Sequence, residues 1–184
     1  MIRKPALALS MLAAAALALG TAHADDTTCR GTLGAGGSHD DIVVPDGARC
    51  TLKGTRAKGS VKVGRGATLV SNAATIDGNI QAEGARSVSV SGGRVDGNIQ
   101  IKQGQAASVR NVRIDGDLQF EENRGSLSAS GNRIDGNLQA FKNRGALNVR
   151  GNVMDGDLQC KENRGGVSGG GNRADSKEDQ CARL

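Results

Sequence analysis

Aromatic residues are almost absent from this chain, which has two Phe, no Trp and no Tyr among its 184 residues. Because large rings are scarce, the apolar core has to be built from Ile, Leu, Val and Ala. The scarcity also removes the stacking side chains on which single-stranded nucleic-acid binding depends. Glycine is abundant by contrast, with 28 residues. The composition therefore predicts narrow aliphatic columns joined by many tight turns.

Long apolar runs are missing after residue 24, so no membrane span is expected in the mature chain. The N-terminal segment combines basic Arg3 and Lys4, an apolar run from Ala6 to Leu19 and the small-residue sequence Ala22-His23-Ala24. This pattern predicts a secretory signal peptide over residues 1–24, cleaved near Ala24. We therefore expect a periplasmic or secreted protein.

Blocks of like charge are also missing. Removing Arg3 and Lys4 reduces the Lys plus Arg count from 24 to 22, against 19 Asp plus Glu, so the net charge falls from +5 to +3. Both signs are interspersed along the chain, and a chain without a basic stripe gives little support to nucleic-acid binding. The mild excess predicts only unspecific attraction to anionic polymers.

The phrase Asp-Gly-(Asn/Asp)-(Ile/Leu)-Gln recurs along the middle of the chain. Its copies begin at Asp77, Asp96, Asp115, Asp135 and Asp155, at spacings of 19, 19, 20 and 20 residues. A period of this length is typical of a solenoid, in which one coil cannot bury its apolar side alone. Polar and apolar residues alternate within each coil, as strands require. We predict an all-β, single-stranded parallel β-helix of about seven coils of 19–20 residues, right-handed as parallel crossovers usually are.

Residues one period apart are expected to stack in inward columns. The columns are Ile80, Ile99, Leu118, Leu138 and Leu158; Ala82, Ile101, Phe120, Ala140 and Cys160; and Ile76, Val95, Ile114, Ile134 and Met154. Phe141 is expected on the surface, because its neighbours one period away are Glu121 and Lys161. The predicted organisation is a signal peptide at 1–24, an N-terminal lead-in or cap at 25–41, coils at 42–159 and a C-terminal coil and cap at 160–184.

Asparagine forms two further columns in the last coils. Asn123, Asn143 and Asn163 begin the phrase Asn-Arg-Gly, which marks a corner, and Asn132, Asn152 and Asn172 each follow a glycine. Stacked asparagines hydrogen-bond to the coils on either side of them. We expect both columns to be structural ladders.

The cysteines of the mature chain fall into two pairs, Cys29 with Cys50 and Cys160 with Cys181, each with a spacing of 21 residues. Export places them in an oxidising compartment. Four cysteines allow three connectivities, but a spacing close to one coil puts both members of a pair on adjacent strands. We therefore predict two local disulfides that staple the ends of the solenoid. Capped ends predict a monomer.

The first Asp of each phrase would stack in a column of like charges, whose repulsion has to be offset. We expect the offset from turn chemistry, in which each carboxylate accepts a backbone N–H near its own Gly, and from Arg94, Arg113, Arg133 and Arg173 two residues earlier. Calcium is an alternative, with Asp115, Asp117, Asp155 and Asp157 as candidate ligands. The calcium-binding repeat Gly-Gly-x-Gly-x-Asp is absent, so we prefer an interpretation without a resident cofactor.

Outward polar residues of the phrase form a flat ladder that suits a glycan chain or an envelope protein as partner. Its members are Asn79, Gln81, Asn98, Gln100, Asp117, Gln119, Asn137, Gln139, Asp157 and Gln159. The competing interpretation is a solvated ladder whose side chains bond to neighbouring coils.

The C-terminal sequence resembles the ends of a family of small exported bacterial proteins built from the same coils. The matching segments are Leu158 to Asn163 (Leu-Gln-Cys-Lys-Glu-Asn), Gly169 to Asn172 (Gly-Gly-Gly-Asn) and Lys177 to Cys181 (Lys-Glu-Asp-Gln-Cys). Gly165-Gly166-Val167 replaces a proline-containing stretch of that pattern, and Asp175-Ser176 replaces Gly-Asn. The resemblance implies a β-helix and export, but no activity or binding residues. By analogy alone, the architecture is also similar to that of bactofilins, which are polymer-forming β-helices.

Catalytic signatures are missing: the chain has no Gly-x-Ser-x-Gly elbow, no phosphate-binding loop and, after the signal peptide, a single histidine, His39. No catalytic residue is therefore nominated. We expect a non-enzymatic scaffold or adhesion module that binds envelope glycan or protein through its flat polar faces. The alternatives are a minimal calcium-dependent polysaccharide lyase and a self-assembling envelope polymer.

Overall fold

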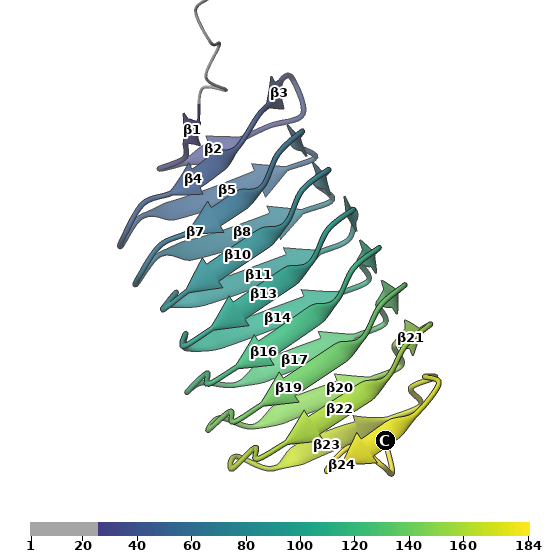
Figure 1. Cartoon of the computed structure of the whole chain (residues 1–184). Helices are drawn as coiled ribbons and strands as arrows, with labels where there is room; N and C mark the ends of the chain where they lie inside the picture. Colours follow the sequence, from purple (N-terminus) through teal and green to yellow (C-terminus); the bar gives the residue numbers. More distant parts are fainter. Residues whose placement is uncertain (1–25) are drawn as a thin grey trace, which may run out of the picture.

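Most coils contribute one strand to each of three parallel sheets, and the coils stack side by side along one axis (Figure 1). The computed structural model describes residues 26–184, which wind into a solenoid of about eight turns. The described residues contain no helix, and therefore no helix that could cross a membrane. The predicted all-β parallel β-helix is confirmed. The predicted signal peptide and its cleavage site near Ala24 lie outside the described residues.

Sheets A, B and C form the three long faces of the solenoid. Sheet A contains β1 (Thr27–Thr28), β4 (Ile42–Val44), β7 (Val61–Val63), β10 (Ile80–Glu83), β13 (Ile99–Lys102), β16 (Leu118–Glu121), β19 (Leu138–Phe141), β22 (Leu158–Lys161) and β24 (Lys177–Asp179). Sheet B contains β2 (Thr32–Leu33), β5 (Arg49–Lys53), β8 (Thr68–Asn72), β11 (Ser87–Ser91), β14 (Ala106–Arg110), β17 (Leu127–Ser130), β20 (Leu147–Arg150) and β23 (Val167–Gly170). Sheet C contains β3 (Ser38–His39), β6 (Arg56–Ala57), β9 (Thr75–Ile76), β12 (Arg94–Val95), β15 (Arg113–Ile114), β18 (Arg133–Ile134) and β21 (Val153–Met154).

The strand register confirms the predicted inward columns. Ile80 pairs with Ile99 and Phe120 pairs with Ala140 in sheet A, while Val95 pairs with Ile114 in sheet C. All the predicted members are buried, so each coil covers the apolar side of the next. Register is specified this firmly because a slip by one residue would turn every inward side chain to solvent.

One coil precedes the first coil expected from the sequence. β1, β2 and β3 pair in parallel with β4, β5 and β6, so part of the predicted lead-in at 25–41 is itself a turn of the solenoid. These strands are two residues long and consist mostly of Thr and Ser. Their sequence therefore has no apolar alternation that would predict strands, and this coil accounts for about eight turns instead of about seven.

The two asparagine columns are buried ladders, as predicted. The amide Nδ2 of Asn152 donates to Asn172 Oδ1 at 3.0 Å and to the carbonyl oxygen of Ala129 at 2.9 Å. In the other ladder, Gln180 takes the place of a further asparagine: its Oε1 accepts from the backbone N–H of Asn163 at 2.8 Å, and its Nε2 donates to the Asn163 carbonyl oxygen at 2.8 Å. Gln180 therefore terminates this ladder at the C-terminal cap.

Gly125, Gly145 and Gly165 stack at the corner between sheets A and B, where the backbones of neighbouring coils approach closely. A Cβ atom added to Gly145 would lie 1.8 Å from the carbonyl oxygen of Gly125, and one added to Gly165 would lie 2.2 Å from the carbonyl carbon of Gly145. No side chain fits at these positions, so the Arg-Gly pairs mark a corner, as the sequence predicts.

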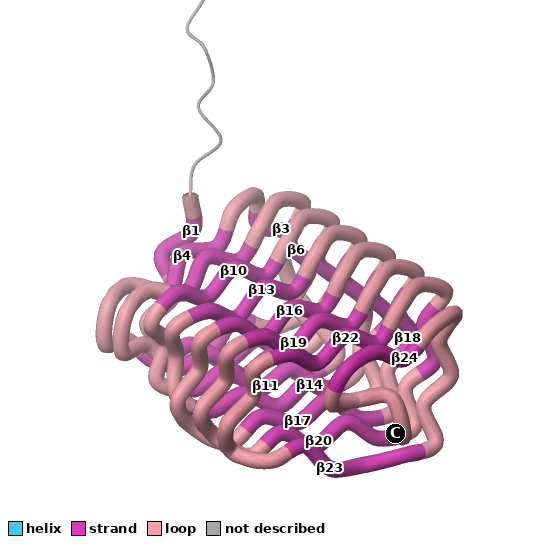
Figure 2. Tube along the Cα trace, turned by 60° about the horizontal axis from the view of Figure 1, so that its bottom comes forward, coloured by secondary structure: helices cyan, strands magenta, loops and turns pink. Residues whose placement is uncertain are grey.

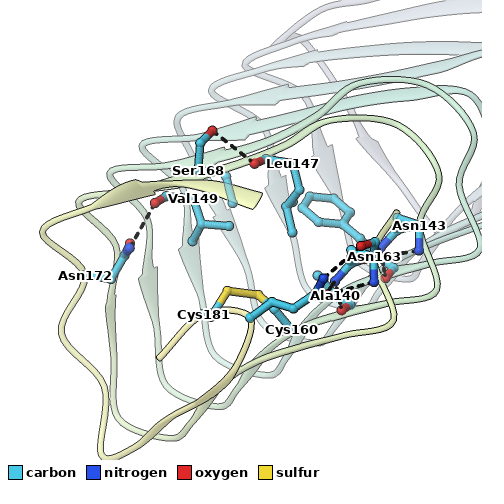
Figure 3. The surroundings of a disulfide bond; sticks show 12 residues. Ala140, Asn143, Leu147, Val149, Cys160, Asn163, Ser168, Asn172 and Cys181 are labelled. Atoms are coloured by element: carbon cyan, nitrogen blue, oxygen red, sulfur yellow. Dashed lines mark hydrogen bonds between the residues drawn. A yellow bond between two sulfur atoms is a disulfide. The ribbon is translucent and has the colours of Figure 1, made fainter. Parts of the chain in front are cut away.

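Both predicted disulfides are present, with Cα–Cα distances of 5.5 Å for Cys29–Cys50 and 5.3 Å for Cys160–Cys181. Their geometry differs from the one expected, since neither bridge joins register partners. Cys29 directly follows β1 of sheet A, whereas Cys50 lies in β5 of sheet B, so this bridge crosses the core between two sheets. Cys160 in β22 pairs with Asp179, and Cys181 lies beyond β24 in the C-terminal turn (Figure 3). Each bridge thus ties a terminal segment to the coil beneath it.

The last coil replaces core residues with polar ones. Lys177 continues the column of Leu138 and Leu158, and Asp179 continues that of Ala140 and Cys160. The apolar columns therefore end at this coil, where Cys181 is buried and Leu184 packs against the core.

Ser71 is a buried polar residue in the core beneath sheet B. It is buried on the inward side of β8, between Leu52 and Val90 in the adjacent coils, and its Oγ has no hydrogen-bond partner. Replacing Ser71 by Ala is expected to raise the free energy of unfolding by about 1 kcal/mol, because a buried hydroxyl without a partner is removed. The thermal midpoint should rise by about 2–4 °C.

The matched control for Ser71 is Ser89→Ala, which removes a hydroxyl from the outer face of the next strand, β11. This variant should leave the thermal midpoint unchanged. A lower midpoint for Ser71→Ala would show that its hydroxyl is stabilising.

Candidate functional site

The predicted polar ladder lies on the outer face of sheet A, along which β10, β13, β16, β19 and β22 run side by side (Figure 2). Gln81 pairs with Gln100, Gln100 with Gln119, Gln119 with Gln139 and Gln139 with Gln159, so the glutamines form one straight row. The row of Asn79, Asn98, Asp117, Asn137 and Asp157 lies at the turn that leads into these strands. The structure thus brings all ten predicted residues into two adjacent rows.

The Asn/Asp row binds the backbone of the neighbouring coil. The backbone N–H of Asn98 donates to Asn79 Oδ1 at 2.8 Å, and that of Asp117 donates to Asn98 Oδ1 at 2.7 Å. In the next coils, the backbone N–H of Asn137 donates to Asp117 Oδ1 at 2.7 Å, and that of Asp157 donates to Asn137 Oδ1 at 2.9 Å. These side chains therefore hold the turns together, and each has one oxygen committed to the fold.

The glutamine row is divided into two halves. Toward the C-terminus, Gln139 Nε2 donates to Gln159 Oε1 at 2.9 Å, and Gln159 Nε2 donates to Glu178 Oε2 at 3.2 Å. Toward the N-terminus, Gln81 and Gln100 make no side-chain hydrogen bond to another described residue, and both line a groove. The amides of this half are therefore available to a ligand.

This N-terminal groove has a volume of about 640 Å³ and is open to solvent along the face of sheet A. Gly64, after β7, lets the neighbouring coil approach closely at one end of the groove, since a Cβ atom there would lie 2.3 Å from Asp46 Oδ1. Charged side chains of both signs surround it, namely Asp46, Lys62, Arg65, Glu83 and Lys102. Amide and charged groups around an open, elongated hollow suit a polar polymer better than a small apolar ligand.

An ion pair fixes one wall of the N-terminal groove. Lys62 Nζ donates to Asp41 Oδ2 at 2.8 Å, and this hydrogen bond, together with the backbone N–H of Ser60, lowers the pKa of Asp41 below its usual value. The same hydrogen bond raises the pKa of Lys62. Both groups are therefore charged at neutral pH, and the Lys62 side chain is held toward the preceding coil, which contains Asp41 and β4.

The Asp column is neutralised by arginines of sheet C in a two-coil pattern. Arg94 binds Asp96 of its own coil and Asp115 of the next, and Arg113 binds Asp115 at 3.2 Å and Asp135 at 2.8 Å. The hydrogen bond to Asp96 raises the pKa of Arg94. The predicted arginine contribution is thus present for Arg94, Arg113 and Arg133, each of which also reaches the next coil. Arg173, the fourth predicted arginine, forms no ion pair within residues 26–184.

The predicted turn chemistry lies one row away from the Asp column. Among residues 26–184, no backbone N–H donates to the carboxylates of Asp77, Asp96, Asp115, Asp135 or Asp155. The backbone N–H groups donate instead to the side chains of the Asn/Asp row. The carboxylates of the Asp column bind arginines instead, because a hydrogen bond between two charged groups is stronger than one from a neutral backbone N–H.

The four calcium candidates already have partners. Asp115 is bound by Arg94 and Arg113, and Arg133 lies 3.9 Å from Asp155. Asp117 Oδ1 accepts from the backbone of Asn137, and Asp157 Oδ1 accepts from Ser176 Oγ at 2.9 Å. Residues 26–184 contain no group of three or more His, Cys, Asp or Glu placed to hold a metal ion. Guanidinium groups at the Asp column disfavour a cation there.

A second groove, which sequence reasoning missed, follows the corner between sheets A and B. It has a volume of about 760 Å³ and is lined by Arg65, Glu83, Gln103, Glu122, Arg124, Lys142, Arg144, Glu162 and Arg164. Arg124, Arg144 and Arg164 come from the three Asn-Arg-Gly phrases. None of them forms an ion pair within the described chain. The signal was present in the sequence, because Arg94, Arg113 and Arg133 of sheet C have an Asp two residues later and these arginines do not.

Phe141 lies on the outer face of β19, between Glu121 and Lys161 of the adjacent strands, as predicted. It is half-buried and lines a hollow of about 260 Å³ with Glu121, Lys142, Lys161 and Glu162. Because Lys142 and Glu162 also line the corner groove, the two hollows adjoin.

Comparisons with known proteins do not assign this chain to a family. No protein-family model, no curated protein and no solved structure matches this chain. The function has to be argued from the geometry of the faces and corners described above.

Proposed function

We propose that this protein is a non-enzymatic binding scaffold of the periplasm or the extracellular space, and that its ligand is a linear envelope glycan lying along sheet A. One observation carries the proposal: the amide side chains of Gln81 and Gln100, which form no hydrogen bond to another described residue, line an open groove that runs across several coils. A glycan chain offers hydroxyl groups at regular intervals, which suit a row of amides at regular intervals. An envelope protein is the other partner that such a face can accept.

A rigid stack supports this function. Hydrogen bonds link each coil to the next on all three sheets, and the asparagine ladders and the Asp–Arg network add contacts between coils. A row of ligand-binding groups held at fixed spacing loses little conformational entropy when a polymer binds. The disulfides are consistent with an oxidising compartment, and the C-terminal resemblance to exported β-helix proteins supports the same location.

A polysaccharide lyase has less support, because the carboxylates nominated for calcium have arginine, N–H or hydroxyl partners. Incubating the mature chain with acidic polysaccharides should therefore produce no unsaturated, ultraviolet-absorbing products. The appearance of such products would replace the scaffold with an enzyme. Self-assembly is also disfavoured, because the last coil closes the apolar columns with Lys177 and Asp179. Reversible oligomers in light scattering would contradict that conclusion.

The direct test is a glycan array probed with residues 25–184. We expect binding to at least one linear polysaccharide, weakened about tenfold by the double substitution Gln81→Ala/Gln100→Ala, which removes two hydrogen-bonding amides. The matched control is Ser89→Ala/Ser108→Ala, which truncates two paired residues on the outer face of sheet B. Absence of binding to every glycan, or equal weakening by the control, would overturn the proposal.

A further inference from the structure

Cations without acidic partners gather at the corner between sheets A and B. Arg94 and Arg113 on sheet C are each bound by two carboxylates, whereas Arg124, Arg144 and Arg164 are exposed and form no ion pair within residues 26–184. Lys142 and Lys161 beside them also lack ion pairs in the described chain. We call these five residues the basic corner. Guanidinium groups stacked at coil spacing repel each other, and no carboxylate of residues 26–184 forms an ion pair with them.

The geometry of the corner places these positive charges along a line. Each arginine is followed by a glycine of the Gly125, Gly145 and Gly165 stack, where the absence of Cβ atoms lets consecutive backbones pass in close contact. The arginines therefore recur once per coil, at the strand spacing of about 4.8 Å, along a line parallel to the solenoid axis. A matching ligand carries anionic groups at intervals along an extended chain. The planar fork of Arg pairs with carboxylates through two parallel hydrogen bonds.

Phe141 supplies an independent observation about the ligand. It is the only aromatic residue on the surface of residues 26–184, since the other Phe of the chain, Phe120, is fully buried. Its hollow adjoins the corner groove through Lys142 and Glu162. A half-exposed ring beside polar groups provides an apolar plate for the C–H face of a sugar ring.

The acidic residues of the same groove distinguish between polyanions. Glu122 and Glu162 form no ion pair within the described chain and line the groove with the arginines. Their carboxylates accept hydrogen bonds from hydroxyl groups, which a polysaccharide offers along its whole length. They repel the densely spaced phosphates of a nucleic acid. The combination of cations, carboxylates and one aromatic ring therefore favours a sugar polymer of moderate charge density.

We propose that the basic corner binds a linear polysaccharide bearing carboxylate groups, with Arg124, Arg144 and Arg164 on the carboxylates and Phe141 under a sugar ring. The site rests on the proposed glycan-binding function but uses residues distinct from Gln81 and Gln100 of the N-terminal groove. The ligand class proposed for the basic corner is therefore an acidic polysaccharide.

The test uses polygalacturonate as the probe, with its fully methyl-esterified form as the uncharged counterpart. The mature protein is expected to bind polygalacturonate, and the triple substitution Arg124→Gln/Arg144→Gln/Arg164→Gln should weaken binding at least about tenfold. Phe141→Ala should weaken it about fivefold, because the stacking surface is lost. The thermal midpoints of both variants should match that of the parent protein, and the esterified polymer should not bind.

The matched control is Lys53→Gln/Arg110→Gln/Arg150→Gln, which removes the same charge from residues at the far end of the sheet B strands. Equal weakening by this control would mean unspecific attraction and would overturn the proposal, as would tighter binding to poly(dT) than to polygalacturonate. Failure of polygalacturonate to bind, with another glycan bound through Gln81 and Gln100, would remove this site alone. Failure of every glycan would remove the scaffold function as well.

Discussion

Replacing Asn143 by Ala is expected to lower the free energy of unfolding by about 3–5 kcal/mol, since several buried polar groups lose their partners at once. The Asn143 side chain is fully buried at 0% exposure. Its Oδ1 accepts from the backbone N–H of Asn123 at 2.9 Å and from Asn123 Nδ2 at 3.1 Å. Its Nδ2 donates to the Phe120 carbonyl oxygen at 3.0 Å and to Asn163 Oδ1 at 2.9 Å. Chemical denaturation of both proteins measures the difference.

Asn148→Ala is the matched control, because Asn148 lies in β20 of the same coil but is exposed and makes a single side-chain contact, with Ser168 Oγ at 3.2 Å. Its substitution should change the free energy of unfolding by less than about 0.5 kcal/mol. A loss of similar size in the two variants would mean that the ladder adds nothing beyond the general cost of truncating an asparagine.

The fold was predictable because each inward position is occupied in successive coils by residues of the same kind, either apolar or asparagine. Ile80, Ile99 and Leu118 leave a single register in which all are buried, and the same holds for Asn123, Asn143 and Asn163. Features that depart from the 19–20-residue sequence repeat were not predictable. The coil of β1 to β3 lacks apolar alternation, and Gln180 stands 17 residues from Asn163, off the 20-residue repeat.

The candidate site was only partly predictable, because repetition shows which residues share a face but not which atoms are already bonded. The sequence places Asn79 and Gln81 in neighbouring rows, and only the structure shows that Asn79 Oδ1 is bound by the next coil while Gln81 faces a groove. In the same way, the sequence puts an Asp two residues after Arg94 and none there after Arg124, but it does not show which carboxylates each guanidinium binds. The side-chain geometry shows that Arg94 is neutralised by Asp96 and Asp115 whereas Arg124 is not neutralised.

Removing the C-terminal disulfide with Cys160→Ala/Cys181→Ala is expected to cost about 3 kcal/mol, the value for closing a loop of this size. Contacts in a solenoid are made mainly between neighbouring coils, so the loss should stay local. The bridge holds the turn that carries Gln180, whose side chain bonds to Asn163 (Figure 3). We therefore expect the C-terminal coil to open before the rest of the stack.

Amide hydrogen exchange separates this local opening from general destabilisation. In the Cys160→Ala/Cys181→Ala variant, protection should be lost at the backbone N–H groups of Asn163 and Gln180 and retained at Ile80 in the middle of the stack. Cys29→Ala/Cys50→Ala should give the mirror result, with loss confined to the first coils. Gln180→Ala, which keeps the bridge, should deprotect Asn163 alone. Uniform loss of protection along the chain would contradict independent caps, because it would mean that the solenoid unfolds as one cooperative unit and that the bridges stabilise it from both ends.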